Sequence, residues 1–202
     1  MKIYVVGNSK NRFLPLNNIR EKFLVDQPHD GDNIDDLNPW YCELTGLYYL
    51  WKHVNDDIVG LEHYRRYFVN NRKQLLSEYE IRNILKTHDI ICCLYNDNKS
   101  VFQGYKGHRF GTFEFFSLVK ELPNYELGRN YLCGFNFIVF NMFICKKELI
   151  NEYCEWFFKN IAMLTLKPEY KRYIGYLAEY IFGAWLHSKK LKIYYSKYVV
   201  NK

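Results

Sequence analysis

The chain of 202 residues has a formal net charge of +6, and 49% of its residues are hydrophobic and 19% aromatic. This composition excludes a disordered chain, and the length suits one domain, residues 1–202, that buries about 70% of its unfolded surface. The basic residues are scattered without long runs, so the charge fits an anionic small molecule, a membrane surface or nucleic acid equally well.

Six cysteines lack both the C-x-x-C pair and the spacing of zinc ligands, which indicates reduced, mostly buried thiols. The opening segment MKIYVVGNSK is typical of a strand, because its apolar run is too short for a signal peptide. No segment approaches the roughly 18 apolar residues of a membrane span. We therefore expect a cytoplasmic protein, with peripheral contact at the inner face of the membrane as an open option.

Strands alternate with helices along the chain. The sequence predicts strands at 2–6, 58–64, 89–95, 134–145 and 191–200. It predicts helices at 39–53, 77–88, 112–122, 147–164 and 169–188, and loops at 7–37 and 96–111. Several strands are apolar on both faces, which favours an α/β fold whose mostly parallel or mixed central sheet is flanked by helices.

Two of these helices have clear start signals. Asn38 followed by Pro39 fits an N-cap and the first helical position, and Ser77 with Glu80 fits a capping box. The first helix also carries one apolar stripe, made of Trp40, Leu44, Leu47, Tyr48 and Trp51.

Polar side chains gather where the strand at 58–64 ends, in the order Glu62, His63, Tyr64, Arg65 and Arg66. Ligands of open α/β sheets bind outside the carboxyl ends of strands, so the ends of the 2–6 and 58–64 strands are the expected site. Two adjacent guanidinium groups there suit a diphosphate, and His63 and Glu62 add acid, base or metal-binding options. The alternative is a surface turn with two solvated arginines.

A second polar group surrounds the start of the 39–53 helix, where free backbone N–H groups favour an anion. Its members are Asp32, Asn33, Asn38, Tyr41, Glu43 and Thr45. A carboxylate at Glu43 must pair with an arginine or face a ligand. The alternative is helix capping and turn formation alone. Asp30 and Asp32 also match the D-x-D pattern that holds a divalent ion in many sugar transferases, as a weak alternative.

Two further positions are candidates for ligand contact. Arg172, Tyr176 and Glu179 fall on one face of the last helix, with two turns, about 10 Å, between the first and the last. They either reach into one cleft or form a solvated face. Asn141, before Met142, interrupts an apolar run and either touches a ligand or ends the sheet. Phosphate-binding glycine loops and the G-x-S-x-G and H-E-x-x-H motifs are absent from the sequence.

Four blocks carry a resemblance: GDNIDDLNPWYCELTGLYYLWKH, IVGLEHYRRYF, FNMFICKKELINEYCEWFF and RYIGYLAE. In this order they resemble a bacterial family that is found with capsular and exopolysaccharide genes, long catalogued as a domain of unknown function and regarded as glycosyltransferases. The resemblance implies the GT-A type of nucleotide-diphosphosugar transferase fold. It also implies transfer of a sugar, with UDP-galactofuranose as one donor, to a surface glycan. Tyr180 follows Glu179 where the family pattern has an arginine.

The resemblance assigns site residues to each block: Asp32, Asn33, Asn38, Tyr41, Glu43, Thr45, His63, Tyr64, Arg65, Arg66, Asn141, Met142, Arg172, Gly175 and Glu179. We expect Arg65 and Arg66 to neutralise the leaving nucleotide, with Glu179, or else Glu62, as the base. No cofactor is then required, and Mn²⁺ or Mg²⁺ is the alternative.

The expected partners are a nucleotide-sugar donor and a glycan or lipid-linked glycan acceptor, without nucleic acid. Two other readings stay open. One is a non-catalytic relative that binds a sugar or nucleotide. The other is a single-strand nucleic-acid binder that stacks bases on its aromatic side chains.

Overall fold

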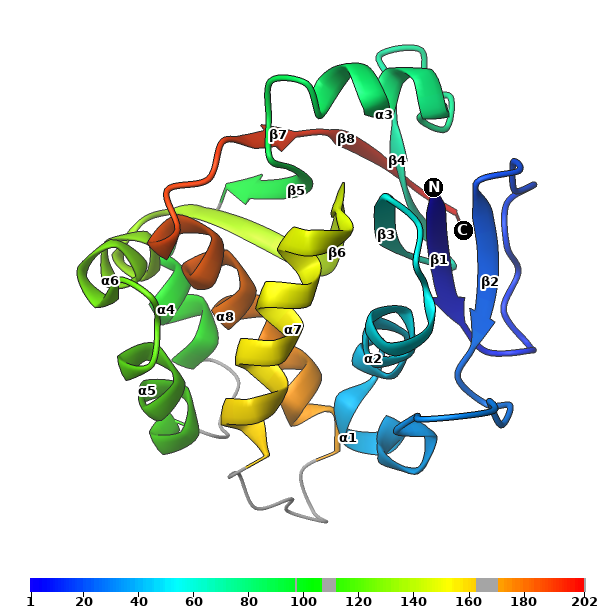
Figure 1. The fold of residues 1–202 in the computed structure, drawn as a ribbon. Coiled ribbons are helices and arrows are strands. Elements are labelled where there is room, and N and C mark those ends of the chain that lie inside the picture. The colour runs from blue at the N-terminus through cyan, green and yellow to red at the C-terminus, as the bar shows by residue number, and fades with distance from the viewer. Residues whose placement is uncertain (97, 107–111, 163–170, 202) are drawn as a thin grey trace.

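The computed structural model describes residues 1–96, 98–106, 112–162 and 171–201. Within them, eight strands form one mixed sheet in the order β2-β1-β3-β6-β5-β7, and β4 links β3 to β8 (Figure 1). The strands are β1 (Lys2–Gly7), β2 (Arg20–Leu24), β3 (Ile58–His63), β4 (Arg66–Val69), β5 (Ile90–Asn96), β6 (Asn136–Lys146), β7 (Ile193–Tyr195) and β8 (Lys197–Val200). The mixed α/β sheet predicted from the sequence is confirmed.

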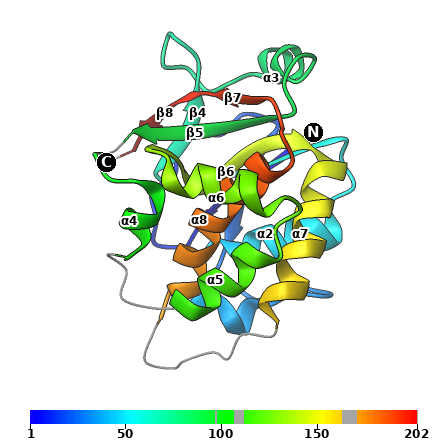
Figure 2. The same ribbon diagram turned by 90° about the vertical axis from the view of Figure 1, so that its left-hand side faces the viewer.

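Helices cover the sheet unevenly (Figure 1). They are η1 (Asp35–Leu37), α1 (Asn38–Tyr41), α2 (Leu44–His53), α3 (Glu78–Ile84), α4 (Val101–Lys106), α5 (Thr112–Lys120), α6 (Tyr125–Cys133), α7 (Lys147–Ile161) and α8 (Tyr173–Ser188). Figure 2 shows α5 and α6 in front of α8 and α4 beside it, while α3 lies at the top of the view, above β7. The helix α8 is buried along most of its length because it packs against both β6 and α6.

The strands bury alternate residues on two faces, as their apolar sequences predict. Along β5, Ile90 and Cys92 join the large core under the helices, whereas Ile91 and Cys93 join a smaller core. That smaller core is closed by Phe68 of β4 and by apolar residues of α3. All six cysteines are free thiols.

Parallel pairing places the carboxyl ends of β1 and β3 side by side. β1 pairs in parallel with β2 and β3, and Val6 lies opposite His63 in the ladder. Tyr64 N–H donates to the carbonyl of Val6 at 2.8 Å, so the chain after β3 leaves the sheet beside the chain after β1. The carboxyl ends of β1 and β3 therefore open on the same edge.

The helix expected at 39–53 is broken in two. Cys42 adopts φ 54°, a left-handed conformation that ends α1 before α2 begins. Its carbonyl accepts hydrogen bonds from Asn38 Nδ2 at 3.0 Å and Thr45 Oγ1 at 2.9 Å, so side chains replace the helical bonding. Pro39 lies inside α1, but the N-cap is Leu37 rather than Asn38.

Several elements differ from the expectation. The loops predicted at 7–37 and 96–111 contain β2 and α4, and β4 and α6 were not predicted. The single strand predicted at 191–200 is divided into β7 and β8, because the chain changes its pairing partner at Ser196 from β5 to β4. The capping box of Ser77 and Glu80 is confirmed. His108 and Arg109 of the 96–111 segment lie outside the described residues.

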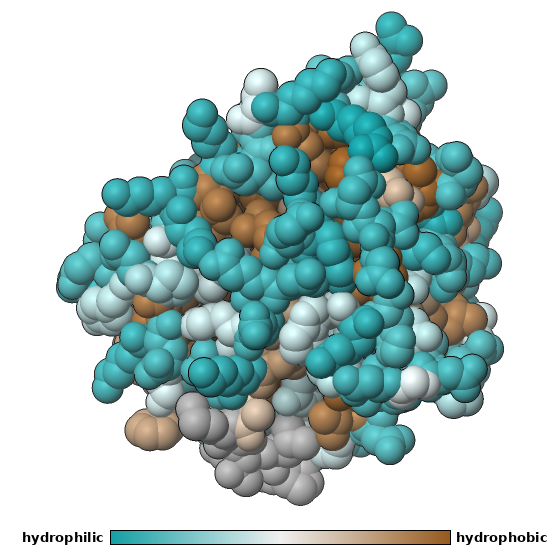
Figure 3. Space-filling view, in the orientation of Figure 1, coloured by the Kyte–Doolittle hydropathy of each residue, from teal (hydrophilic) through white to brown (hydrophobic). Residues whose placement is uncertain are grey.

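The surface seen in Figure 3 is mostly hydrophilic, with separate apolar patches. In the described part of the chain, no helix combines the length and apolarity needed to cross a bilayer.

Candidate active site

A cavity of about 740 Å³ opens at the carboxyl ends of β1 and β3, where the sequence predicted the site. Residues that follow these two parallel strands form one side of it, and the amino end of α8 forms the other. Its lining residues include Gly7, Asn8, Asn11, Asn38, Glu43, His63, Tyr64, Arg65, Arg66, Phe140, Lys171, Arg172, Tyr176 and Glu179.

The end of β1 was expected to border the site, but the residues of the turn that follows it were not singled out from the sequence. Asn8 N–H donates to Asn11 Oδ1 at 2.7 Å, and Asn11 N–H donates to the carbonyl of Asn8 at 3.0 Å. A Cβ on Gly7 would lie 2.8 Å from atoms of Phe13 and Tyr64, so only glycine fits there. A Gly-Asn pair directly after a buried strand was the available signal.

Arg65 and Arg66 supply positive charge to the cavity. Arg65 is exposed, whereas Arg66 is half-buried with its guanidinium carbon 4.0 Å from the centroid of the Phe140 ring. Burial lowers the pKa of Arg66, and the neighbouring charge of Arg65 lowers it further. Among the described residues, neither arginine has a carboxylate within ion-pair distance, and the charge of Glu179 acts on Arg66 only from farther away. Lys171 and Arg172 add positive charge from the α8 side of the cavity.

An irregularity of β6 shapes a further part of the cavity wall, at Phe140. Phe140 and Asn141 adopt φ values of 74° and 51°, which residues other than glycine rarely adopt. The pairing of β6 with β5 also shifts register nearby. The distortion aims two groups at α8 and the α1–α2 junction. Phe140 N–H donates to Glu179 Oε1 at 2.6 Å, and Asn141 Nδ2 donates to Glu43 Oε1 at 2.7 Å.

Glu179 can change protonation near neutral pH. Burial raises its pKa to about 7, opposed by the Phe140 N–H bond and by Arg66 and reinforced by the charge of Glu43. A buried carboxyl that ionises near the working pH suits acid–base catalysis. This residue and Tyr176 line the cavity from one face of α8, as the helical spacing predicted. Arg172 also lines it, but from the left-handed N-cap before α8 and not from the helical position that was predicted.

His63 lies at the end of β3 and also lines the cavity. Burial lowers its pKa, with Glu43 opposing and Arg66 reinforcing the effect, so the ring is neutral at physiological pH. Its Nε2 atom is buried and has no hydrogen-bond partner among the described residues. A buried polar atom without a protein partner is unusual in a folded protein and is a feature of functional sites.

The junction of α1, α2 and α8 is closely packed. Arg172 adopts φ 67° at the N-cap of α8, and its N–H donates to the carbonyl of Pro39 at 2.8 Å. Its side chain hydrogen-bonds the thiol of Cys42. Burial raises the pKa of this thiol to about 11. A Cβ on Gly175 would lie 3.3 Å from Cys42, so this glycine lets α8 approach α1.

Glu62 does not lie in the cavity. Its side chain is fully buried in an ion pair with Arg20, with Nε to Oε2 at 2.8 Å and Nη2 to Oε1 at 2.9 Å. Oε1 also accepts the Phe68 N–H at 3.0 Å. Glu62 thus accepts three hydrogen bonds within the protein and is fully buried, which makes it a structural carboxylate rather than the base expected as an alternative to Glu179.

The acidic loop before α1 also lies outside the cavity. Asp32 accepts from Tyr48 at 2.8 Å and pairs with Lys52 at 3.5 Å, and Asn33 donates to the carbonyl of His29. Neither Asp30 nor Asp32 lines the cavity, so the D-x-D segment does not fit a metal held under a donor there. In the ranges that the structure describes, no three His, Cys, Asp or Glu side chains gather as a metal site.

The remaining predicted residues have supporting positions. Tyr41, Thr45 and Met142 are buried, and Met142 belongs to the smaller core on the far side of the sheet. Asn38 lines the cavity and bonds Thr45 at 3.3 Å. Of the predicted site residues, the cavity itself gathers Asn38, Glu43, His63, Tyr64, Arg65, Arg66, Arg172, Gly175 and Glu179.

Comparison with solved structures shows a related fold. The chain superimposes on the apo structure of the WbbM bifunctional glycosyltransferase with a TM-score of 0.82 and 21% sequence identity. The match covers 100% of this chain and 45% of that protein, so the chain spans less than half of its length. No curated protein matches the sequence. A family model described as a domain of unknown function, DUF4422, matches residues 2–190, and the chain therefore belongs to this family.

Proposed function

We propose that the protein is a glycosyltransferase that moves a sugar from a nucleotide-diphosphate donor to a hydroxyl group of a glycan. The observation that carries this proposal is the placement of two arginines without a close ion pair, Arg65 and Arg66, in one cavity with the half-buried Glu179, whose pKa is raised. The shared fold with a glycosyltransferase supports it.

The arginines suit the diphosphate of the donor. Guanidinium groups bind phosphate oxygens through paired N–H donors and keep their charge at all physiological pH values. As the bond between the anomeric carbon and the β-phosphate oxygen breaks, the electron pair and negative charge pass to the departing nucleotide. Fixed positive charge at that point stabilises the transition state more than the ground state.

Glu179 suits the acceptor side of the same step. Its ionised carboxylate takes the proton of the acceptor hydroxyl while the hydroxyl oxygen bonds the anomeric carbon. His63, neutral and with a free Nε2, is placed to hydrogen-bond the donor or acceptor. The proton gained by Glu179 then returns to solvent, so the residue is ready for another turnover.

Finer features of the proposal follow the family resemblance. The donor to test first is UDP-galactofuranose, and the acceptor is a surface, capsular or exopolysaccharide glycan, free or lipid-linked. We propose that the arginines replace a divalent metal, because the only D-x-D pattern lies outside the cavity. Peripheral contact with the cytoplasmic membrane surface would serve a lipid-linked acceptor.

A thermal-shift panel of UDP, other nucleoside diphosphates and nucleotide sugars, each with EDTA or with Mn²⁺, tests this function. A ligand that binds only the folded state raises the melting temperature. We expect stabilisation by UDP and UDP-sugars in EDTA, and release of UDP when an acceptor is added. Stabilisation without turnover by any donor would indicate a non-catalytic binder. Stabilisation only with Mn²⁺ would overturn the metal-free mechanism.

A further inference from the structure

A second cavity, of about 310 Å³, adjoins the first. Residues of β5, β6, α4, α8 and β8 line it, and two of them, Phe140 and Glu179, also line the first cavity. The two cavities therefore meet at Glu179, which is the proposed base. The mechanism described above uses only the first cavity.

The ring of Phe140 separates a cationic side from an aromatic side. The guanidinium of Arg66 lies 4.0 Å from its centroid, and the ring of Tyr198 meets it edge-on with centroids 5.2 Å apart. Arg66 belongs to the lining of the first cavity, and Tyr198 belongs to that of the second. The two sides thus differ in the ligand chemistry they suit.

Five of the residues that line the second cavity are aromatic. Phe137 and Tyr180 stack with centroids 4.4 Å apart, and Tyr95 is 49% exposed although it is a large aromatic side chain. Lys99 and Ser100, at the start of α4, add polar groups to the rim. An aromatic wall with a few polar groups is typical of sites that hold amphipathic ligands.

We propose that this second cavity binds a sugar ring of the acceptor glycan and presents its hydroxyl group to Glu179. The inference rests on the proposed glycosyltransferase function. A sugar ring has an apolar C–H face that packs on aromatic rings and a hydroxyl edge that needs polar partners, and the cavity offers both. Its volume suits a small ring better than a long lipid chain.

The position of the cavity supports this occupant. A donor sugar attached to a diphosphate at Arg65 and Arg66 has its anomeric carbon on the Glu179 side of the first cavity. An acceptor that enters from the second cavity reaches the same carboxyl from the other side of Phe140. The carboxylate then lies beside the point where the acceptor hydroxyl meets the anomeric carbon, as removal of its proton during direct transfer requires.

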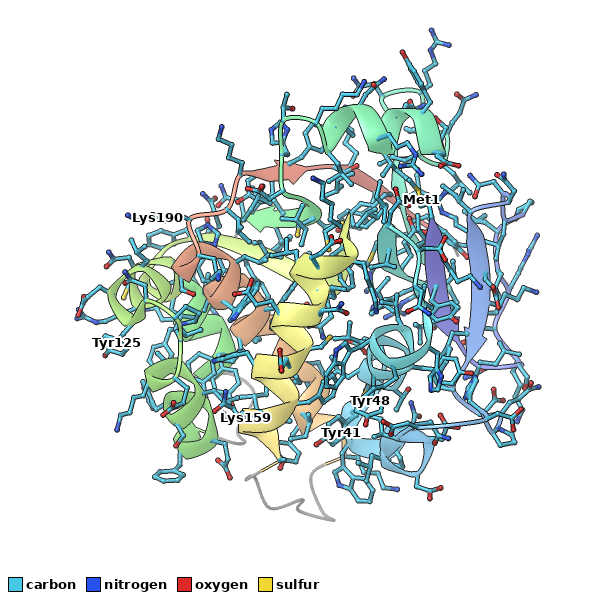
Figure 4. The ribbon with its side chains drawn as sticks, in the orientation of Figure 1. Met1, Tyr41, Tyr48, Tyr125, Lys159 and Lys190 are labelled. Carbon is cyan, nitrogen blue, oxygen red and sulfur yellow. The ribbon has the colours of Figure 1, made fainter. Side chains whose placement is uncertain are left out.

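The test uses saturation-transfer NMR on the full chain with UDP present and methyl glycosides of galactose, glucose, mannose and rhamnose as probes. Tyr95→Ala removes one exposed ring and is expected to fold normally, and Tyr95→Phe keeps the ring. The matched control is Tyr125→Ala, because Tyr125 is 44% exposed on α6 and lines neither cavity. Figure 4 shows it at the left-hand edge of the molecule, on α6.

We expect at least one glycoside to receive saturation from the aromatic protons of the wild type. Tyr95→Ala should weaken its binding about tenfold, with Tyr95→Phe and Tyr125→Ala close to the wild type and UDP binding unchanged throughout. If UDP binds but no glycoside does, or if Tyr95→Ala binds glycosides normally, the acceptor proposal is wrong while the donor proposal stands. Binding of farnesyl phosphate in place of glycosides would overturn it in favour of a lipid site. Failure of UDP to bind the wild type would instead count against the proposed function itself.

Discussion

The Phe140 amide donates to Glu179 Oε1 at 2.6 Å from a backbone conformation, φ 74°, that takes it out of a regular strand. The irregularity of β6 and the carboxyl of α8 are thus parts of one feature. The strand is irregular at Phe140 and Asn141. Because of this irregularity, Phe140 contacts Glu179 and Asn141 contacts Glu43, and both carboxylates line the cavity.

The pH dependence of transfer should report Glu179. Because its pKa is about 7, the carboxylate fraction rises as pH increases through neutrality, and the rate should rise with it before levelling above about pH 8. Glu179→Gln should reduce the rate by at least 10²-fold and remove this rise. Rates measured from pH 5 to 9 with saturating donor check this. A mutant that keeps both rate and pH profile would exclude Glu179 as the base.

The free energy of unfolding should change with pH in the opposite direction to the transfer rate. The folded carboxyl of Glu179 holds its proton up to about pH 7, whereas an unfolded glutamate loses it near 4.5, so the folded state binds more protons between these values. The free energy of unfolding should therefore fall by about 2–3 kcal/mol as pH rises through this window. Glu179→Gln should flatten this part of the curve, as urea titrations at pH 4.5 and 8 would measure. An unchanged slope in the mutant would contradict the raised pKa.

Asn141 allows the backbone strain and the amide contact to be separated. Asn141→Ala and Asn141→Gly both remove the hydrogen bond to Glu43, but only alanine retains the cost of a left-handed backbone, about 1 kcal/mol. We expect the alanine variant to be less stable than the glycine variant by about that amount in chemical denaturation. Equal stabilities would mean that β6 is regular at this position in solution.

Glu62 should matter for folding rather than for ligand binding. Removal of one partner from a buried ion pair costs about 3–5 kcal/mol, so Glu62→Ala should destabilise the protein by that order. Glu21→Ala, which breaks the surface pair with Lys2, should cost no more than about 0.5 kcal/mol. Urea denaturation measures both. A small effect of Glu62→Ala on stability, together with loss of transfer, would restore Glu62 as a candidate base.

The site could be predicted from the sequence where local pattern determines position. The polar residues after β1 and β3 meet because parallel neighbouring strands end at one edge, and the 3.6-residue period places Tyr176 and Glu179 on one face of α8. The apolar strands also predicted a sheet covered on both faces.

The features that could not be predicted depend on contacts between residues far apart in the sequence. Glu62 looked like part of a polar cluster, but its partner Arg20 lies 42 residues away on an edge strand, β2. That strand was missed because its exposed charged residues give no apolar alternation. The break at Cys42 depends on side chains that take up its carbonyl and on the approach of Gly175, neither of which leaves a helical breaker in the sequence.

The central claim is that Arg66, with Arg65, holds the diphosphate of the donor. Titration calorimetry of UDP into wild type, Arg66→Ala and the exposed control Arg72→Ala tests it most directly. We expect Kd to increase about 10–100-fold for Arg66→Ala, as loss of a charged hydrogen bond implies, and to stay within twofold for Arg72→Ala. Equal UDP affinity of a folded Arg66→Ala protein and the wild type would contradict the claim.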